Sequence, residues 1–245
     1  MQVNSFFHRL VLASVYIILL TLNNMFKKNN TDKITGSEGL FIVFDGPADS
    51  GKSSIIKAVS VWLEAQNILT HKVAEPALGS IGKICREYAN KPEHPYTLAC
   101  LIAAGRYKNL VDEIIPYKSQ GYVVLEHRYL ASNYVYQIMH GVEREFIDGI
   151  NTHITIPNLT FLVTSSSEQI KLRRSLDETT DIFQSTEHIE FEIYLFEEAA
   201  KLLQQKGHSI VIINNTSEIS IAIKEVQYKL LPLIKEKLGI SIKIE

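Results

Sequence analysis

Residues 41–54 read FIVFDGPADSGKSS, and this stretch decides the fold. An apolar run from residue 40 to residue 44 precedes it like a buried strand, and an apolar pattern with helical spacing follows it. Between the two, Gly46–Ser53 fits the pattern GxxxxGK[ST]. In such a loop the backbone N–H groups curl around an anion, and the positive end of the new helix points at the same place. The stretch therefore predicts a site for the phosphates of a nucleoside triphosphate.

Individual residues of this loop have expected tasks. Lys52 is expected to reach the β- and γ-phosphates, and the Ser53 hydroxyl is expected to bind Mg²⁺. Asp45, at the end of the preceding strand, is a candidate for the outer shell of the metal. ATP and Mg²⁺ are thus the predicted cofactors. The residues expected to bind ATP are Gly46, Pro47, Ala48, Asp49, Ser50, Gly51, Lys52, Ser53 and Ser54.

The composition sets limits on the class of protein. A chain of 245 residues is long enough for one α/β domain with a well-buried core. A formal net charge of −2 gives no broad basic surface, so we expect small-molecule nucleotides as partners and no nucleic acid. Cys85 and Cys100 lack a metal-binding spacing, and both are expected to be reduced, buried thiols of a cytoplasmic protein.

The N-terminus is the unusual part of the chain. Residues 10–22 (LVLASVYIILLTL) are almost continuously apolar, and lysines follow at 27 and 28. Three interpretations stay open: an extension upstream of a start at Met25, a membrane anchor that leaves the domain on the cytoplasmic side, or a cleaved signal peptide. The extension is favoured, and membrane contact through residues 10–22 is not. Residues 1–38 are accordingly predicted to be an apolar extension with a polar linker.

From residue 39 onward, apolar strands alternate with helical patterns, which predicts a parallel sheet with helices on both faces. The predicted strands span residues 40–45, 69–74, 121–126, 158–164 and 209–213. The helical patterns lie near residues 53–66, 80–90, 96–117, 130–152, 166–175, 188–206 and 217–237. The domain is predicted to end near residue 238, and the tail 239–245 alternates like an edge strand but is equally compatible with a loose end.

A phosphate loop alone does not distinguish kinases from GTPases or motor ATPases. The base-reading NKxD of GTPases is absent from the sequence. The third predicted strand ends YVVLEHRY, with Arg128 just past it, and a guanidinium there could bridge the phosphates of donor and acceptor. Phosphoryl transfer depends mainly on positioning and charge neutralisation, so this arrangement favours a small kinase.

Four blocks of sequence, in order and at matching spacing, resemble the thymidylate kinase family. The blocks are FIVFDGPADSGKSS (41–54), AEPALGSIGKICRE (74–87), LIAAGRYKNLVDEIIPYKSQGYVVLEHRYLASNYVYQ (101–137) and PNLTFLV (157–163). Arg173 and Arg174 then fall where the family has a lid arginine, and the likeness extends over residues 39–235. It implies a P-loop kinase with a three-layer α/β/α sandwich, a five-stranded parallel sheet, a short lid and a homodimer.

The activity that this resemblance implies is transfer of the γ-phosphoryl group of ATP to dTMP, giving dTDP. Lys52, Arg128, Arg173 and Arg174 are the catalytic residues it implies. Because Asp49 replaces a basic loop residue found in some members, the lid would supply positive charge here. In the alternative interpretation, the two lid arginines simply pair with Asp177 and Glu178 on a solvated face.

The resemblance also implies an acceptor site. Arg106 would contact the base edge, Arg128 the acceptor phosphate and Tyr136 the deoxyribose, although Tyr136 could equally be core packing. The residues implied to bind the acceptor are Glu75, Ile102, Arg106, Ser132, Asn133, Tyr136 and Gln137.

Several positions depart from the family pattern, and most of them lie on the acceptor side. His127 replaces the aspartate that helps to organise Mg²⁺, and Ala48 replaces a loop carboxylate that binds the acceptor's 3′-hydroxyl. Ile102 replaces the aromatic ring that stacks on the base, and Gly105 precedes the base-reading arginine in place of an acid or amide. Two alternatives therefore stay open: a kinase for another deoxynucleotide or a deoxynucleoside, and a catalytically weak ATP-binding regulatory protein.

Overall fold

The computed structural model describes residues 38–89, 91, 93–176 and 188–244. The apolar segment 10–22 and the acidic residues Asp177 and Glu178 lie outside these residues. None of the described helices has the length and the apolar composition that a membrane span requires.

A five-stranded sheet with the order β2-β3-β1-β4-β5 forms the centre of the fold, and its neighbouring strands are all parallel. The strands are β1 (Leu40–Asp45), β2 (Thr70–Ala74), β3 (Val123–His127), β4 (Leu159–Thr164) and β5 (Ile210–Asn214). The central strand β1 is buried along its whole length, as its continuous apolar sequence predicts for a strand covered on both faces. It pairs with β3 from Leu40 opposite Val123 and with β4 from Ile42 opposite Leu159.

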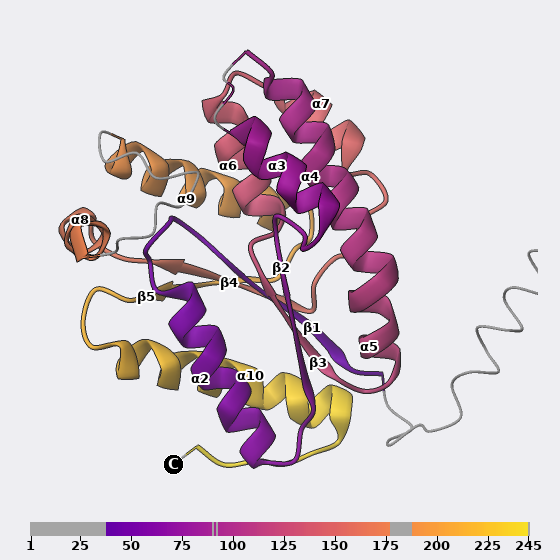
Figure 1. Ribbon diagram of the computed structural model, residues 1–245. Coiled ribbons are helices and arrows are strands. Elements are labelled where there is room, and N and C mark those ends of the chain that lie inside the picture. Colours follow the sequence, from indigo (N-terminus) through magenta and orange to yellow (C-terminus); the bar gives the residue numbers. More distant parts are fainter. Residues whose placement is uncertain (1–37, 90, 92, 177–187, 245) are drawn as a thin grey trace, which may run out of the picture. The chain divides into compact units, whose positions relative to one another are not determined.

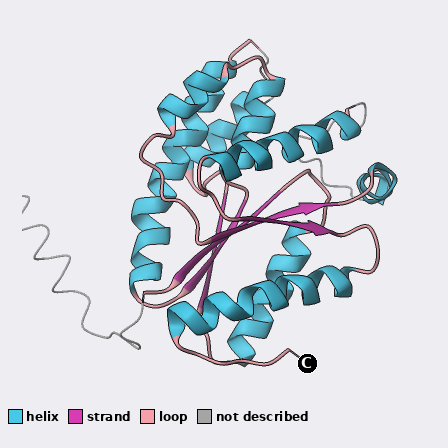
Figure 2. Ribbon diagram, turned by 180° about the vertical axis from the view of Figure 1, so that it is seen from behind, coloured by secondary structure: helices cyan, strands magenta, loops and turns pink. Residues whose placement is uncertain are grey.

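Helices cover both faces of the sheet (Figures 1 and 2). On one face, α2 (Lys52–Ala65) and α10 (Ile219–Leu238) pack against alternate β1 side chains such as Phe44. On the other face, α4 (Pro95–Asn109), α6 (Leu130–Met139) and α9 (Ile189–Gln205) pack against Phe41 and Val43. The remaining helices are α3 (Ser80–Ala89), the π-helical turn η1 (Leu110–Ile114), α5 (Ile115–Ser119), α7 (Arg144–Ile150) and α8 (Ser167–Leu176). The predicted three-layer α/β/α architecture is confirmed.

One predicted helix is wrong as a continuous element, and another contains a local irregularity. The region 130–152 is two helices, α6 and α7, because Gly141 adopts a left-handed φ of 81° between them. The region 96–117 is helical throughout, as predicted, but it contains the π turn η1 shortly before Pro116, whose ring has no N–H and would clash with the carbonyl four residues earlier.

The C-terminal tail packs against the domain without pairing as a strand. Ile240 and Ile242 pack against the α2–α10 side of the core. The Trp62 indole N–H donates to the Lys243 carbonyl at 3.1 Å. The interpretation of this segment as an edge strand is therefore wrong for residues 239–244.

Neighbouring residues of β3 point to opposite faces of the sheet. His127 faces α2, whereas Glu126 is fully buried on the other side, near Arg106. Neither carboxyl oxygen of Glu126 has a hydrogen-bond partner among the described residues. Burial, reinforced by the charge of Glu75, raises the pKa of Glu126 well above 4.5.

Replacing Glu126 with glutamine should flatten the pH dependence of stability. The folded carboxyl keeps its proton at pH values where the unfolded one has lost it, so stability declines as the pH rises above the unfolded pKa. The loss is at most about 1.4 kcal/mol per pH unit for one group. Glu126→Gln removes this titration, and we expect a higher free energy of unfolding at pH 8 than in the unmodified chain, with a smaller difference at pH 5. Denaturant unfolding between pH 5 and 9 measures both slopes.

Glu87→Gln on the exposed surface of α3 is the matched control and should leave the slope unchanged. An unaltered slope in Glu126→Gln would contradict the assignment of a proton to this carboxyl group.

Candidate active site

The phosphate loop connects β1 to α2, and two of its glycines are required by close contacts. Gly46 has a φ of 134°, and a Cβ there would lie 2.1 Å from the Val163 carbonyl oxygen. Gly51 has a φ of 97°, and a Cβ there would lie 2.2 Å from Nδ2 of Asn215. The loop therefore turns tightly against the end of β4 and directs its backbone toward the N-terminus of α2.

Lys52 and Ser53 begin α2 and present the two functional groups expected of this loop. The Lys52 ammonium is buried and donates to the carbonyl oxygens of Gly46 (3.0 Å) and Pro47 (2.5 Å), which keeps its charge inside the loop. Ser53 and Ser54 are exposed in the first helical turn. The Ser53 hydroxyl lies 3.4 Å from Nε2 of His127.

Both predicted lid arginines reach the phosphate loop from α8. Arg173 donates to the carbonyl oxygens of Asp49 (3.2 Å) and Asn215 (2.8 Å). Arg174 donates to the Asp49 carboxylate (3.0 Å) and to the carboxylate of Glu192 on α9 (3.0 Å). The prediction that the lid brings positive charge to a loop that carries Asp49 agrees with this arrangement.

Sequence reasoning missed two residues of this site. The Glu192 carboxylate is buried and accepts hydrogen bonds from the Ala48 N–H (3.1 Å), the Tyr136 hydroxyl (2.7 Å) and Arg174. Its position offered a signal, because it is an acidic residue on the apolar face of α9, between Ile189 and Phe196. Asn215 donates to the Ser50 carbonyl at 2.8 Å and gave no recognisable signal in the sequence.

Asp45 is engaged by donors on two sides of the site. It is fully buried and accepts from the backbone N–H groups of Gly46 (2.9 Å), Tyr129 (3.0 Å) and Ser132 (3.0 Å), and also from the Ser132 hydroxyl. These bonds give the carboxylate a structural task. Its predicted part in the outer shell of a metal stays a prediction.

Arg128 follows β3 and lies between the phosphate loop and the acceptor side. Its backbone has a left-handed φ of 68°, and its N–H donates to the Phe44 carbonyl at 2.9 Å. Its guanidinium donates to the Ser132 hydroxyl (3.2 Å) and the Tyr136 hydroxyl (2.9 Å). A strained backbone conformation at a strand end is typical of residues that hold a functional side chain in place.

The structure brings most of the predicted acceptor residues around one cavity of about 20 Å³. Tyr136 lines it and also packs edge-on against Phe196, so its core packing is observed, whereas its contact with the deoxyribose stays a prediction. The cavity is lined by Glu75, Pro76, Ile102, Arg128, Ser132, Asn133, Tyr136 and Gln137.

Arg106 lies behind this cavity, and all five of its N–H donors are used inside the protein. It forms a two-pronged ion pair with Glu75, at 2.7 and 2.5 Å. Its other donors contact the Tyr129 carbonyl (3.2 Å) and the side-chain oxygens of Asn133 (3.0 Å) and Asn151. A direct contact with a base would require one of these bonds to be exchanged, and the predicted contact of Arg106 with the base edge stays a prediction.

Two amide atoms in the cavity wall lack partners among the described residues: Nδ2 of Asn133 and Oε1 of Gln137. The Asn133 amide is held in place because its oxygen accepts bonds from Arg106 and from Asn151 (2.9 Å). Buried polar atoms almost always find partners, so the free donor and the free acceptor are the groups of this wall that are open to a ligand or to water.

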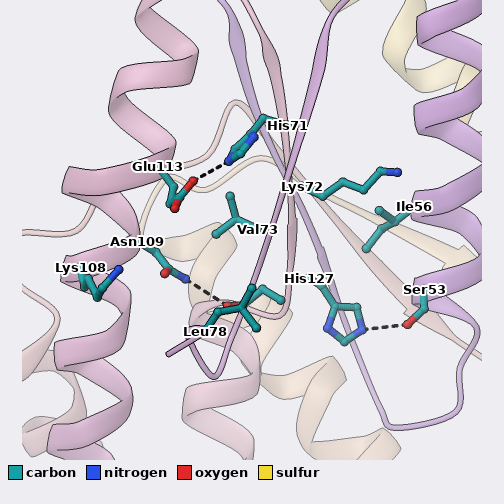
Figure 3. Close-up of a pocket in the computed structure, with 11 residues that line it drawn as sticks. Ser53, Ile56, His71, Lys72, Val73, Leu78, Lys108, Asn109, Glu113 and His127 are labelled. Atoms are coloured by element: carbon teal, nitrogen blue, oxygen red, sulfur yellow. Dashed lines mark hydrogen bonds and ion pairs between the residues drawn. The ribbon is translucent and has the colours of Figure 1, made fainter. Parts of the chain in front are cut away.

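A larger cavity of about 470 Å³ lies along the edge strand β2, between α2 and the α4–η1 segment (Figure 3). Ser53 and His127 line one end of it, and the paired side chains of His71 and Glu113 line the other. Burial, together with the charges of Lys52 and Arg128, lowers the pKa of His127 to about 2. The imidazole is therefore neutral at physiological pH.

Comparison with known proteins agrees with this geometry. The sequence profile of the thymidylate kinase family matches residues 44–226. A probable thymidylate kinase of Methanococcus vannielii is 32% identical over 185 residues, which cover 73% of this chain and 88% of the relative. A thymidylate kinase of Sulfurihydrogenibium sp. is 32% identical over 189 residues (74% and 91%). A probable thymidylate kinase of Pyrobaculum aerophilum is 35% identical over 125 residues, covering half of this chain and 63% of the relative. The chain belongs to the thymidylate kinase family.

Proposed function

We propose that this protein transfers the γ-phosphoryl group of ATP to the 5′-phosphate of dTMP, giving ADP and dTDP. An oxygen of the acceptor phosphate forms the new bond to the γ-phosphorus, and the bond from that phosphorus to the β-phosphate oxygen breaks. Family membership supports the reaction class. The observation that carries the acceptor assignment is the free donor and free acceptor of Asn133 and Gln137 in one cavity wall. A thymine edge offers the complementary pair, an N3–H and a carbonyl oxygen.

The donor half of the reaction uses the phosphate loop and the lid arginines. The loop and the N-terminus of α2 would hold the triphosphate, with the Lys52 ammonium moving from the loop carbonyls to phosphate oxygens. Arg173 and Arg174 already lie on the loop, and their guanidinium groups suit the charge of a phosphoryl group in transfer. A divalent cation, when bound, neutralises charge on the β- and γ-phosphate oxygens. The Ser53 hydroxyl is a hard oxygen ligand that fits Mg²⁺.

The acceptor half depends on Arg128 and the residues around it. Its guanidinium contacts hydroxyl groups that a phosphate could replace with stronger, charge-assisted bonds. The neighbouring cavity has room for about one water molecule, so the acceptor must exchange side-chain contacts there as it binds. The Tyr136 hydroxyl is bonded to both Arg128 and Glu192, so a shift of either side chain on acceptor binding would also change the contacts of Tyr136.

A second acceptor, another deoxynucleotide, is supported by Ile102. This aliphatic side chain in the cavity wall offers no ring on which a base could stack. Stacking on an aromatic side chain contributes about 1–3 kcal/mol per base, so its absence lowers the affinity expected for dTMP relative to a site that has such a ring. The homodimer implied by the family resemblance stays a prediction.

The acceptor is identified by ADP release from the full chain, supplied with ATP and a divalent cation and offered a panel of nucleosides and monophosphates. We expect turnover with dTMP above that with dCMP, whose N3 carries no hydrogen, and above that with thymidine, which lacks the acceptor phosphate. Turnover with a nucleoside alone, or silence with every acceptor despite ATP binding, would contradict the proposal.

Lys52→Ala should reduce turnover by about 10²–10³-fold, the usual cost of losing one group that stabilises developing charge. Lys57→Ala, an exposed lysine of the same helix, should leave turnover unchanged. Circular dichroism checks that both variants fold. Equal activity in the two variants would place the phosphate site elsewhere.

Gln137→Leu removes the free acceptor atom while keeping most of the side-chain volume. We expect kcat/KM for dTMP to fall about tenfold, the cost of one hydrogen bond of about 1.4 kcal/mol, with no change in KM for ATP. Gln205→Leu, on the exposed part of α9, is the control. A Gln137→Leu variant with unaltered dTMP kinetics would remove this residue from the acceptor site.

A further inference from the structure

We propose that His127 is a direct ligand of the divalent cation that accompanies ATP. This ligand would make the protein prefer a cation that accepts nitrogen, such as Mn²⁺ or Co²⁺, over Mg²⁺. The inference rests on the proposed function only in that a nucleotide phosphate must occupy the loop.

The geometry brings two ligand atoms from different elements to one point (Figure 3). Ser53 projects from the first turn of α2 and His127 from the end of β3, and their Oγ and Nε2 atoms are 3.4 Å apart. Adjacent ligands of an octahedral cation, each about 2.1 Å from the metal, are about 3 Å apart. A cation could therefore contact both atoms after a shift of a few tenths of an ångström.

The surroundings leave room for the rest of a coordination shell. Both residues line the cavity of about 470 Å³, whereas a water molecule takes about 30 Å³ of liquid volume. Phosphate oxygens on the loop and water molecules in the cavity could supply the remaining ligands.

Carboxylates, the usual protein ligands of Mg²⁺, are directed elsewhere in the described part of the chain. Glu113, the carboxylate in the cavity lining, binds His71 at 2.7 Å at the other end. Asp45 accepts four hydrogen bonds from protein donors, and Glu126 is buried on the opposite face of the sheet.

The protein's own ligands at this point are thus one hydroxyl oxygen and one imidazole nitrogen. Mg²⁺ is a hard cation that prefers oxygen, whereas imidazole suits first-row transition metals, with affinity rising from Mn²⁺ to Co²⁺ and Ni²⁺. The donor chemistry at His127 therefore disfavours Mg²⁺ relative to these metals.

Pulsed electron paramagnetic resonance of Mn²⁺ tests the ligand directly. The sample is the full chain with Mn²⁺ and ADP, prepared once with ordinary histidine and once with ¹⁵N-histidine, so that nitrogen of the protein is distinguished from nitrogen of adenine. We expect a directly bound nitrogen whose coupling changes with the histidine label. The coupling should vanish in His127→Asp and persist in His71→Asn, the matched histidine of the same cavity.

Cation affinity gives a second readout. In calorimetric titrations of the ADP-bound chain, the ratio of Mn²⁺ to Mg²⁺ affinity should fall about tenfold or more in His127→Asp, since altered metal surroundings typically change affinity by 10–100-fold. The labelled unmodified chain answers the ligand question even if the variant does not fold.

The outcomes separate the two proposals. If ADP and Mn²⁺ bind but no histidine nitrogen couples to the metal, the role of His127 is refuted and the kinase function stands. If no nucleotide binds in the same samples, both proposals fail.

Discussion

The buried carboxylate of Asp45 is the junction on which the site depends. It ends the central strand and accepts N–H bonds from Gly46 in the phosphate loop, and from Tyr129 and Ser132 where α6 begins. A buried charge is tolerated only when donors surround it, so these segments must hold their positions for the strand end to be stable. The same group thereby fixes the phosphate loop relative to the helix that carries Ser132, Asn133, Tyr136 and Gln137. The spacing between donor and acceptor halves follows from that constraint.

A second buried carboxylate, Glu192, connects the lid arginine Arg174 to the phosphate loop and to α6. It contacts the Ala48 N–H of the loop, Arg174 of α8 and Tyr136 of α6. It thus brings negative charge to the loop at the position where Ala48 has no carboxylate of its own. A phosphate group offers the same kind of acceptor oxygens, so substrate phosphates and this carboxylate would compete for Arg174. Without a substrate, the carboxylate of Glu192 thus accepts the hydrogen bond that a substrate phosphate could accept from Arg174.

Much of the fold could be predicted from the sequence because its signals are local. The loop pattern and the apolar strands each depend on a few consecutive residues, and all five strands form where expected to within about two residues. The site depends on distant pairs, and these could not be predicted. Ala48 and Glu192 are 144 positions apart, and the partners of Arg106 come from three separate segments. Gly141 is a possible helix end in the sequence, but the apolar pattern continues past it and predicts one helix where the structure has a turn.

The most direct measurement is a calorimetric titration of the full chain with ATP and a divalent cation. The phosphate loop, with Lys52 inside it and Ser53 at the start of α2, predicts saturable binding of ATP with a dissociation constant below about 1 mM, the upper end of the usual range for enzyme substrates. A folded chain that shows no heat of binding at millimolar ATP would contradict the central claim, that the phosphate loop binds ATP.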